Sequence, residues 1–212
     1  MKSFYKEAAP FFVSLALAPL LIGLISSYSL GLGIISFLIG LPMLAVTLLV
    51  GSAVWLTRGV NRMKEAGSRM EAFQYGAASP LMFVSVLLVA WPSLTFGQYV
   101  GNLSRLAVNY PHYERIIGKA QQQRTADGYV NDDGVEYSVD LGPPVRVAFN
   151  PAGMLDNWSA IIFDPTGEML KADGFDPKTG KFHAPDRITK LFGGDLVKCR
   201  RLWGDFLTCS FT

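Results

Sequence analysis

The most constraining feature of this sequence is a pair of long tracts without a charged residue. No Asp, Glu, Lys or Arg lies between Glu7 and Arg58, and none lies between Glu71 and Arg105. About 20 mostly apolar helical residues cross a hydrocarbon core about 30 Å thick, where the chain must satisfy its backbone groups internally. The two tracts therefore predict an integral membrane protein with helical spans.

The first tract is too long for one span and divides at a polar cluster, residues 26–29, which suits a turn. We therefore predict a three-span transmembrane domain over residues 1–101. Its spans are expected at about residues 9–25, 33–55 and 77–97.

Prolines and a tryptophan add local expectations inside these spans. Pro19 and Pro42 fall within helices and are expected to kink them, because proline donates no backbone hydrogen bond. Trp55 ends the second span, where an indole suits the headgroup level of a bilayer.

Small residues recur at a spacing that lets helices approach closely. Gly97 and Gly101 are four residues apart, as are Thr47 and Gly51. We expect contacts among the three helices of one chain, and the alternative is a homo-oligomer. Because no ionisable residue lies within a span, the chain offers no proton relay or ion pathway for transport.

Basic residues set the expected orientation. They crowd one short loop, residues 57–75, whereas the 26–29 turn carries no charge, so we predict a cytoplasmic loop and N-terminus. The topology-setting residues are Arg58, Arg62, Lys64 and Arg69. Everything from residue 102 onward is then expected outside the cytoplasm. Because this topology explains the basic residues, we do not predict a nucleic-acid partner.

Residues 102–212 have the composition of a small α+β extracytoplasmic domain, predicted as a helix followed by antiparallel hairpins. Apolar positions recur at helical spacing as far as Ala120, with Pro111 expected to kink or divide this helix. Alternation predicts strands at 135–141 and 145–149, with Arg146 facing outward. Further hairpins are expected from 158–163 with 168–172 and from 196–202 with 206–211.

The last hairpin contains both cysteines of the chain. Cys199 and Cys209 are equally far from Gly204, so a ladder closed by a three-residue loop, Trp203–Asp205, would place them opposite each other. The alternatives are a metal pair or two free thiols, but a metal site needs further ligands. We predict a disulfide, in keeping with a position outside the cytoplasm.

Catalytic and cofactor motifs are missing from the sequence. Only two histidines occur, His112 and His183, and we interpret both as surface residues. Acidic turn residues around Asp133 do not match the spacing of a helix-loop-helix calcium site. We therefore predict no catalytic residue, no metal and no cofactor.

Binding is the function that the sequence favours. Aromatic side chains dominate protein-binding hot spots, and those of the predicted extracytoplasmic domain could either serve that role or fill its core. The candidates are Trp158, Trp203, Tyr129 and Tyr137.

We expect a bacterial inner-membrane protein that presents a periplasmic binding domain to another protein. It would act as an accessory subunit of a secretion, pilus or division complex, or as an immunity protein that neutralises a toxin. The alternative is an envelope enzyme acting on lipid or peptidoglycan, with a centre drawn from His183, Asp164, Asp173 and Asp186.

Overall fold

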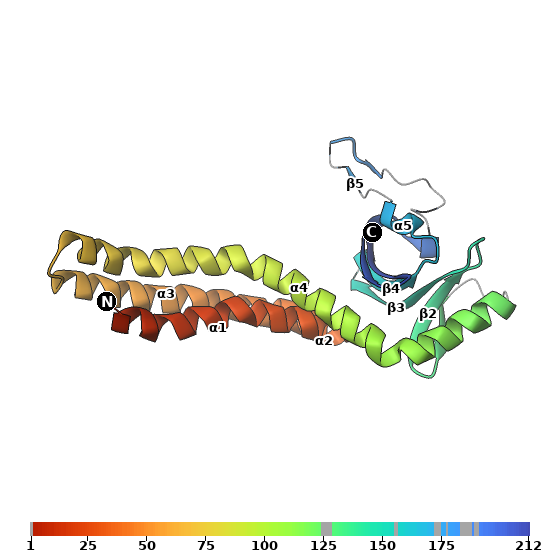
Figure 1. Ribbon diagram of the computed structural model, residues 1–212, viewed down its shortest axis with the longest axis horizontal. Helices are drawn as coiled ribbons and strands as arrows, with labels where there is room; N and C mark the ends of the chain where they lie inside the picture. Colours follow the sequence, from red (N-terminus) through yellow and green to blue (C-terminus); the bar gives the residue numbers. More distant parts are fainter. Residues whose placement is uncertain are drawn as a thin grey trace. The chain divides into compact units, whose positions relative to one another are not determined.

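The computed structural model describes residues 2–123, 129–154, 157–171, 175–176, 178–182, 188 and 191–212 (Figure 1). The chain divides into two compact units. We call them the N-terminal unit, Met1–Gly101, and the C-terminal unit, Asn102–Thr212. Each is described by itself below.

The N-terminal unit is built from long apolar helices. α1 (Lys2–Ser26) is followed by an unbroken run of α2 (Leu30–Ile35), the π-helix η1 (Ser36–Gly40) and α3 (Leu41–Lys64), and then α4 (Arg69–Gln123) begins. Three helical stretches are long and apolar enough to cross a membrane: Phe4–Ser26, Gly31–Lys64 and Arg69–Gln122. The prediction of three long apolar helices is confirmed at this level.

Polar and proline residues explain the local geometry of these helices. The predicted turn is present, because α1 ends at Ser26 and the Ser29 hydroxyl caps α2 by accepting from the Leu32 N–H at 3.5 Å. Just before Pro42, the Leu41 N–H donates to the Ser36 carbonyl, five residues back. Pro42 has no N–H to donate, and the π-helical turn lies where its kink was expected.

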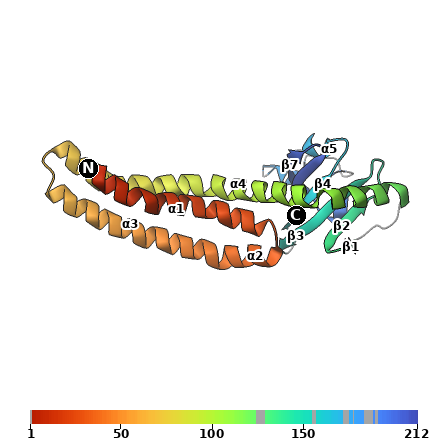
Figure 2. The same ribbon diagram turned by 60° about the horizontal axis from the view of Figure 1, so that its bottom comes forward.

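Small residues bring the helices into contact within one chain (Figure 2). A Cβ added at Gly97 of α4 would collide with the Leu20 backbone of α1, and one at Gly101 would meet the Leu24 carbonyl. Gly51 of α3 lies against an α1 phenylalanine ring in the same way. The small-residue spacing is therefore used for contacts inside the chain.

An aromatic cluster joins α1, α3 and α4. The Phe4 ring lies 5.5 Å from both the Trp55 and Tyr75 rings, edge to face. Trp55 is only 8% exposed, and the Arg58 guanidinium lies 4.8 Å from its ring. The Trp55 indole is thus enclosed by its neighbours, whereas Trp91 of α4 is 70% exposed. The headgroup level of Trp55 stays a prediction.

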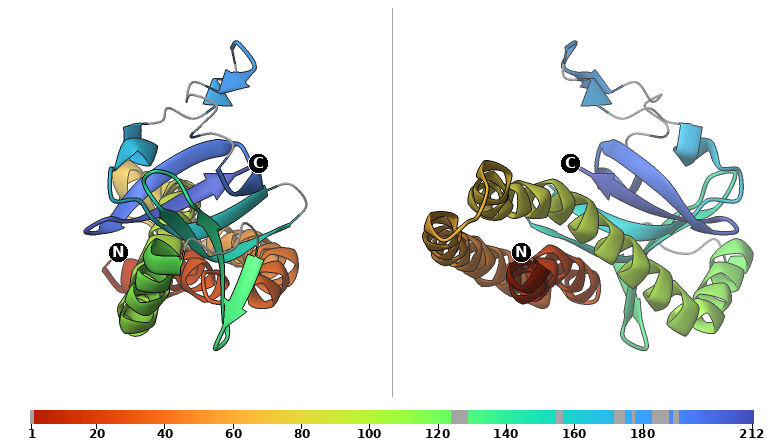
Figure 3. Two further views of the ribbon diagram at one scale, coloured as in Figure 1. Left: turned by 90° about the vertical axis from the view of Figure 1, so that its right-hand side faces the viewer. Right: turned by 60° about the vertical axis from the view of Figure 1, so that its left-hand side comes forward.

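The C-terminal unit contains a six-stranded antiparallel sheet in the order β1-β2-β3-β4-β8-β7 (Figure 3). The strands are β1 (Tyr129–Asp132), β2 (Val135–Asp140), β3 (Arg146–Met154), β4 (Asn157–Phe163), β7 (Leu196–Trp203) and β8 (Phe206–Phe211). A separate pair is formed by β5 (Phe175–Asp176) and β6 (Lys181–Phe182). The predicted C-terminal antiparallel sheet is confirmed.

One face of this sheet is covered by the last part of α4. The Tyr113 ring is fully buried and stacks on Phe149 at 4.1 Å, and its hydroxyl accepts a hydrogen bond from Asn150 at 2.6 Å. Asn102 donates to the Thr208 hydroxyl of β8 at 3.0 Å. These contacts hold the last part of α4, from Asn102 onward, against the sheet.

The same packing explains why Pro111 does not divide α4, although division was one of the two outcomes, a kink or a division, that we expected. Leu106 and Ile116, on either side of the proline, are fully buried. The carbonyl left without an N–H partner belongs to Ala107, an exposed residue whose carbonyl water can reach. Tertiary burial therefore outweighs the local loss of one hydrogen bond.

The other face of the sheet carries α5 (Glu168–Lys171), η2 (Leu191–Gly193) and a second cluster. Its buried residues are Ala148, Ala160, Ile162, Met169, Ile188, Leu191, Leu196, Leu207, Cys209 and Phe211. The predicted hairpin between 158–163 and 168–172 was wrong, because residues 168–171 are helical. β4 pairs with β3 and β8 instead, and the Met169 N–H donates to the Asp164 carboxylate at 3.0 Å.

Candidate functional site

The four aromatic candidates have different environments. Trp158 is half-buried and stacks on Phe211 at 4.0 Å, with ring planes 8° apart, so it belongs to the core. Tyr137 is half-buried on β2. Tyr129 and Trp203, by contrast, are 66% and 61% exposed.

The two exposed aromatics do not form one surface. Tyr129 begins β1 and Trp203 ends β7, and these strands are the opposite edges of the sheet. With strands about 4.8 Å apart, five strand spacings separate the edges by about 24 Å. A single partner would therefore contact one edge or the other as its main site.

Trp203 is held in place by a neighbouring helix and a tight turn. Its ring centroid lies 5.4 Å from that of Tyr110 in α4, and Tyr110 in turn lies 5.7 Å from the buried Phe206. The hairpin turns at Gly204 and Asp205, with Gly204 at a positive φ of 56°, which suits the first position of a two-residue loop. The exposed indole is thus mounted on a supported hairpin tip.

A disulfide joins Cys199 to Cys209, as predicted. The expected three-residue loop was wrong, since Trp203 pairs with Phe206 across a two-residue turn. A register shift between Arg201 and Trp203 compensates and brings Cys199 opposite Cys209. The predicted pairing therefore holds although the predicted loop does not.

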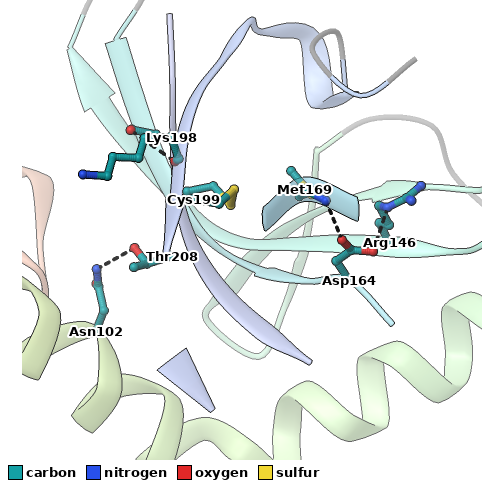
Figure 4. The surroundings of a disulfide bond; sticks show 9 residues. Asn102, Arg146, Asp164, Met169, Lys198, Cys199 and Thr208 are labelled. Carbon is teal, nitrogen blue, oxygen red and sulfur yellow. Dashed lines mark hydrogen bonds and ion pairs between the residues drawn. A yellow bond between two sulfur atoms is a disulfide. The ribbon is translucent and has the colours of Figure 1, made fainter. Parts of the chain in front are cut away.

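Basic side chains line the outer strand beside this disulfide. We call residues 197–201 of this strand the β7 edge. Lys198, Arg200 and Arg201 are all exposed there. Figure 4 shows Lys198 on the side of the strand that faces Asn102 and Thr208, with the Cys199 sulfur directed to the opposite side. The β7 edge therefore presents positive charge, with Trp203 at its end.

A buried ionic cluster lies at the end of β4, and our prediction of an outward Arg146 was wrong. The Arg146 side chain is only 5% exposed. Its Nε donates to Asp164 at 3.1 Å, and its Nη2 donates to Glu168 at 2.9 Å and to the Thr166 hydroxyl at 3.2 Å (Figure 4 shows the first contact). Asp140, the cross-strand neighbour of Arg146, lies 3.6 Å from Nη1. Alternation alone could not find this cluster, although Asp140 opposite Arg146 in the predicted strand pair was a usable signal.

The Asp164 carboxylate is occupied by these contacts. Burial alone would raise the pKa of Asp164, but the Met169 and Thr166 N–H groups, the Thr166 hydroxyl and the Arg146 guanidinium hold it below its ordinary value. A fully buried carboxylate with these partners has no open side for a substrate. The other members of the alternative catalytic centre, His183, Asp173 and Asp186, lie outside the described residues.

The remaining histidine is more buried than expected. The His112 side chain is 14% exposed, and its Nε2 lies 4.0 Å from the Asp132 carboxylate, which Lys119 binds at 2.8 Å. Our interpretation of His112 as a surface residue was wrong, because its side chain is mostly buried and lies beside Asp132 of β1. Among the described residues, no group of three His, Cys, Asp or Glu side chains is arranged to hold a metal ion.

The four basic residues of the predicted loop are placed on helices rather than in a long loop. Arg58, Arg62 and Lys64 belong to the end of α3, and Arg69 begins α4, so only residues 65–68 connect the two helices. Arg62 pairs with the exposed Glu65 at 3.8 Å.

No family model, curated protein or solved structure matches this chain.

Proposed function

We propose that this protein is anchored in a bacterial inner membrane by three spans and presents its C-terminal unit in the periplasm as a protein-binding domain. Two observations support this topology. Large apolar side chains of the three candidate spans are exposed, for example Leu38 at 65% and Leu88 at 71%. The disulfide favours an oxidising compartment for the C-terminal unit.

The observation that carries the binding role is the exposed Trp203. Its indole is 61% exposed although Tyr110 and a disulfide-linked hairpin hold it in place. A tryptophan that is supported but uncovered can bury a large area against a partner with little loss of conformational freedom. The partner would be an envelope assembly, which this chain serves as an accessory subunit, or a toxin, which it neutralises as an immunity protein.

Cysteine labelling tests the topology. Ser68→Cys lies in the short α3–α4 connection and Gly134→Cys in the β1–β2 turn, and each introduces one free thiol. In intact spheroplasts, a membrane-impermeant maleimide should label Gly134→Cys and should label Ser68→Cys only after permeabilisation. The reverse pattern would overturn the proposed orientation.

Site-specific photocrosslinking tests the binding role. A photoreactive residue at Trp203, in full-length protein in living cells, should give one crosslinked protein at a stoichiometric level. The matched control is the same residue at Tyr129, which is equally exposed on the opposite edge. No crosslinked protein at Trp203, or equal crosslinking of many proteins at both sites, would reject the proposal.

A further inference from the structure

We propose that the β7 edge binds an acidic, extended segment of the partner protein as an additional strand of the sheet. This inference rests on the proposed protein-binding function and adds the chemistry of the partner. It depends on the length of the edge, the direction of its backbone groups, the disulfide and the charge of its side chains.

The two edges of the sheet differ in how well they could accept a strand. β1 has 4 residues, whereas β7 has 8. Short edge strands are one device that protects a sheet from unwanted pairing. Among the described residues no strand pairs with the outer side of β7, which contains no proline. β7 is therefore the longer of the two edges, and its regular stretch between two register shifts is residues 198–201.

The register tells which backbone groups face the open side. The Cα atoms of Cys199 and Cys209 are 4.1 Å apart, which marks a pair that does not exchange backbone hydrogen bonds. Arg201 occupies the equivalent position opposite Leu207. The N–H and C=O groups of Cys199 and Arg201 consequently point outward, whereas those of Lys198 and Arg200 are directed to β8.

The disulfide makes this edge a rigid template. It ties β7 to β8 at Cys199, the middle of the regular stretch between the two register shifts of the strand. An edge that is already ordered loses less conformational entropy when a second chain pairs with it. The disulfide thus favours strand pairing at Cys199, whose backbone N–H and C=O groups point outward.

The side chains of the β7 edge select an acidic occupant. Lys198 and Arg200 lie on one face of the strand and Arg201 on the other, so a paired segment meets positive charge on both faces. Opposite charges directly across two strands stabilise the pair, and like charges destabilise it. A second copy pairing through its own β7 edge would place these like charges together, which disfavours a homodimer here.

A peptide titration tests the inference on full-length protein in detergent micelles. The probe is a ten-residue peptide of alternating glutamate and valine, and its control replaces glutamate with lysine. Amide hydrogen exchange should slow at Cys199 and Arg201 when the acidic peptide binds. Exchange at Lys198 and Arg200 should not change, because their amides already face β8. The lysine peptide should bind at least tenfold more weakly.

Two modified reagents separate strand addition from charge attraction alone. Two further peptides are N-methylated at alternate residues, one at the odd positions and one at the even positions. One of them should lose binding and the other should keep it, because only one of these two sets of amides faces β7. Lys198→Glu with Arg200→Glu should weaken binding at least tenfold, whereas Lys178→Glu, an exposed basic residue in the β5–β6 turn, should not.

Three results would overturn the inference. One is equal binding of the two N-methylated peptides, and another is no preference for the acidic peptide over the lysine peptide. The third is protection of the β7 edge by vesicles containing anionic phosphatidylglycerol but not by the peptide, which would assign the edge to lipid headgroups. In each case a single protein crosslinked at Trp203 would leave the proposed binding function standing.

Discussion

Large apolar side chains are exposed in one unit of this chain and buried in the other. Leu38, Phe73 and Leu88 of the N-terminal unit are 65%, 68% and 71% exposed, whereas Phe149 and Ile162 of the C-terminal unit are fully buried. Contiguous apolar surface of the first kind is not tolerated in water and needs lipid or protein to cover it. The membrane that we propose for the N-terminal unit would provide this cover for its exposed apolar residues.

The same comparison makes the exceptions in the C-terminal unit informative. The large apolar side chains that the structure describes there as exposed are Val108, Tyr129 and Trp203. Of these three residues, Trp203 lies on the hairpin that the Cys199–Cys209 disulfide links. In a unit that otherwise buries its apolar groups, Trp203 is the residue on which the proposed protein-binding role rests.

The buried ionic cluster around Arg146 belongs to the C-terminal unit, and Arg146→Ala should give the largest loss of stability among the variants. The substitution leaves Asp164 buried without its cationic partner, which should lower the free energy of unfolding of the C-terminal unit by about 3–5 kcal/mol. Urea titration of the full-length protein in detergent, followed by pulse proteolysis, measures this value. Lys178→Ala, at an exposed position, is the control. A loss below about 1 kcal/mol would show that the cluster is not a structural ion network.

Two tryptophans test which aromatics belong to the core. Trp158→Ala should destabilise the C-terminal unit by about 3 kcal/mol, because it removes the ring stacked on Phe211. Trp203→Ala should change stability by less than about 0.5 kcal/mol, because this residue is 61% exposed. The same proteolysis assay compares the two variants. Equal destabilisation would place Trp203 in the core and remove the argument for binding.

The disulfide should contribute somewhat less than the buried charge. Its cysteines are 10 residues apart, and closing a loop of this length stabilises a protein by about 2–3 kcal/mol in the chain-entropy model. Cys199→Ser with Cys209→Ser should lose this amount, and reduction of the wild-type protein should do the same. Urea titrations with and without reductant measure both. An unchanged midpoint in either case would contradict the expected role.

Two glycines of α4 should respond to alanine in opposite directions. Gly97→Ala forces a Cβ against the Leu20 backbone and should destabilise helix packing by about 1–3 kcal/mol. Gly118 has open space around its Cα, so Gly118→Ala should stabilise the C-terminal unit by about 0.5–1 kcal/mol through helix propensity. Resistance to SDS measures the first and urea titration the second. A neutral Gly97→Ala would show that the helices are not in close contact there.

The smallest effect concerns one proton on Asp164. Because the pKa of this carboxyl is lower in the folded protein, its contribution to stability is complete above the unfolded value of about 3.9. That contribution is lost as the pH falls from there through the folded pKa. Urea midpoints measured across this acidic range should fall less steeply for Asp164→Asn. The control Asp205→Asn, at an exposed position, should keep the wild-type slope.

Sequence patterns predicted the elements whose signal is local. Charge-free tracts gave the three long helices, and polar residues 26–29 located the first turn. The equal spacing of Cys199 and Cys209 about Gly204 predicted their pairing. The loop has two residues rather than the expected three, but the register shift between Arg201 and Trp203 adds one residue to β7 and keeps the two cysteines opposite each other. Period-two alternation identified β2 and the first part of β3, and the turn around Gly204 identified the hairpin of β7 and β8.

Predictions failed where a distant contact outweighed the local pattern. Arg146 alternates as an outward residue, but three carboxylates and a hydroxyl from separate positions enclose it. The rings of Phe4 and Tyr75, which lie on other helices, pack against Trp55, and the sequence pattern did not indicate these contacts. Residues 168–171 follow a turn and resemble a returning strand, yet a bond from Met169 to Asp164 makes them helical.

The sequence by itself determined the apolar helices, the C-terminal antiparallel hairpin and its disulfide, because charge, periodicity and spacing are properties of neighbouring residues. Tertiary structure decided which aromatic side chains remain exposed, which charges are buried and which strands form the edges of the sheet. These properties depend on the order of strands and on contacts between residues far apart in the chain. The candidate binding edge at β7 could therefore be recognised only after the sheet was assembled.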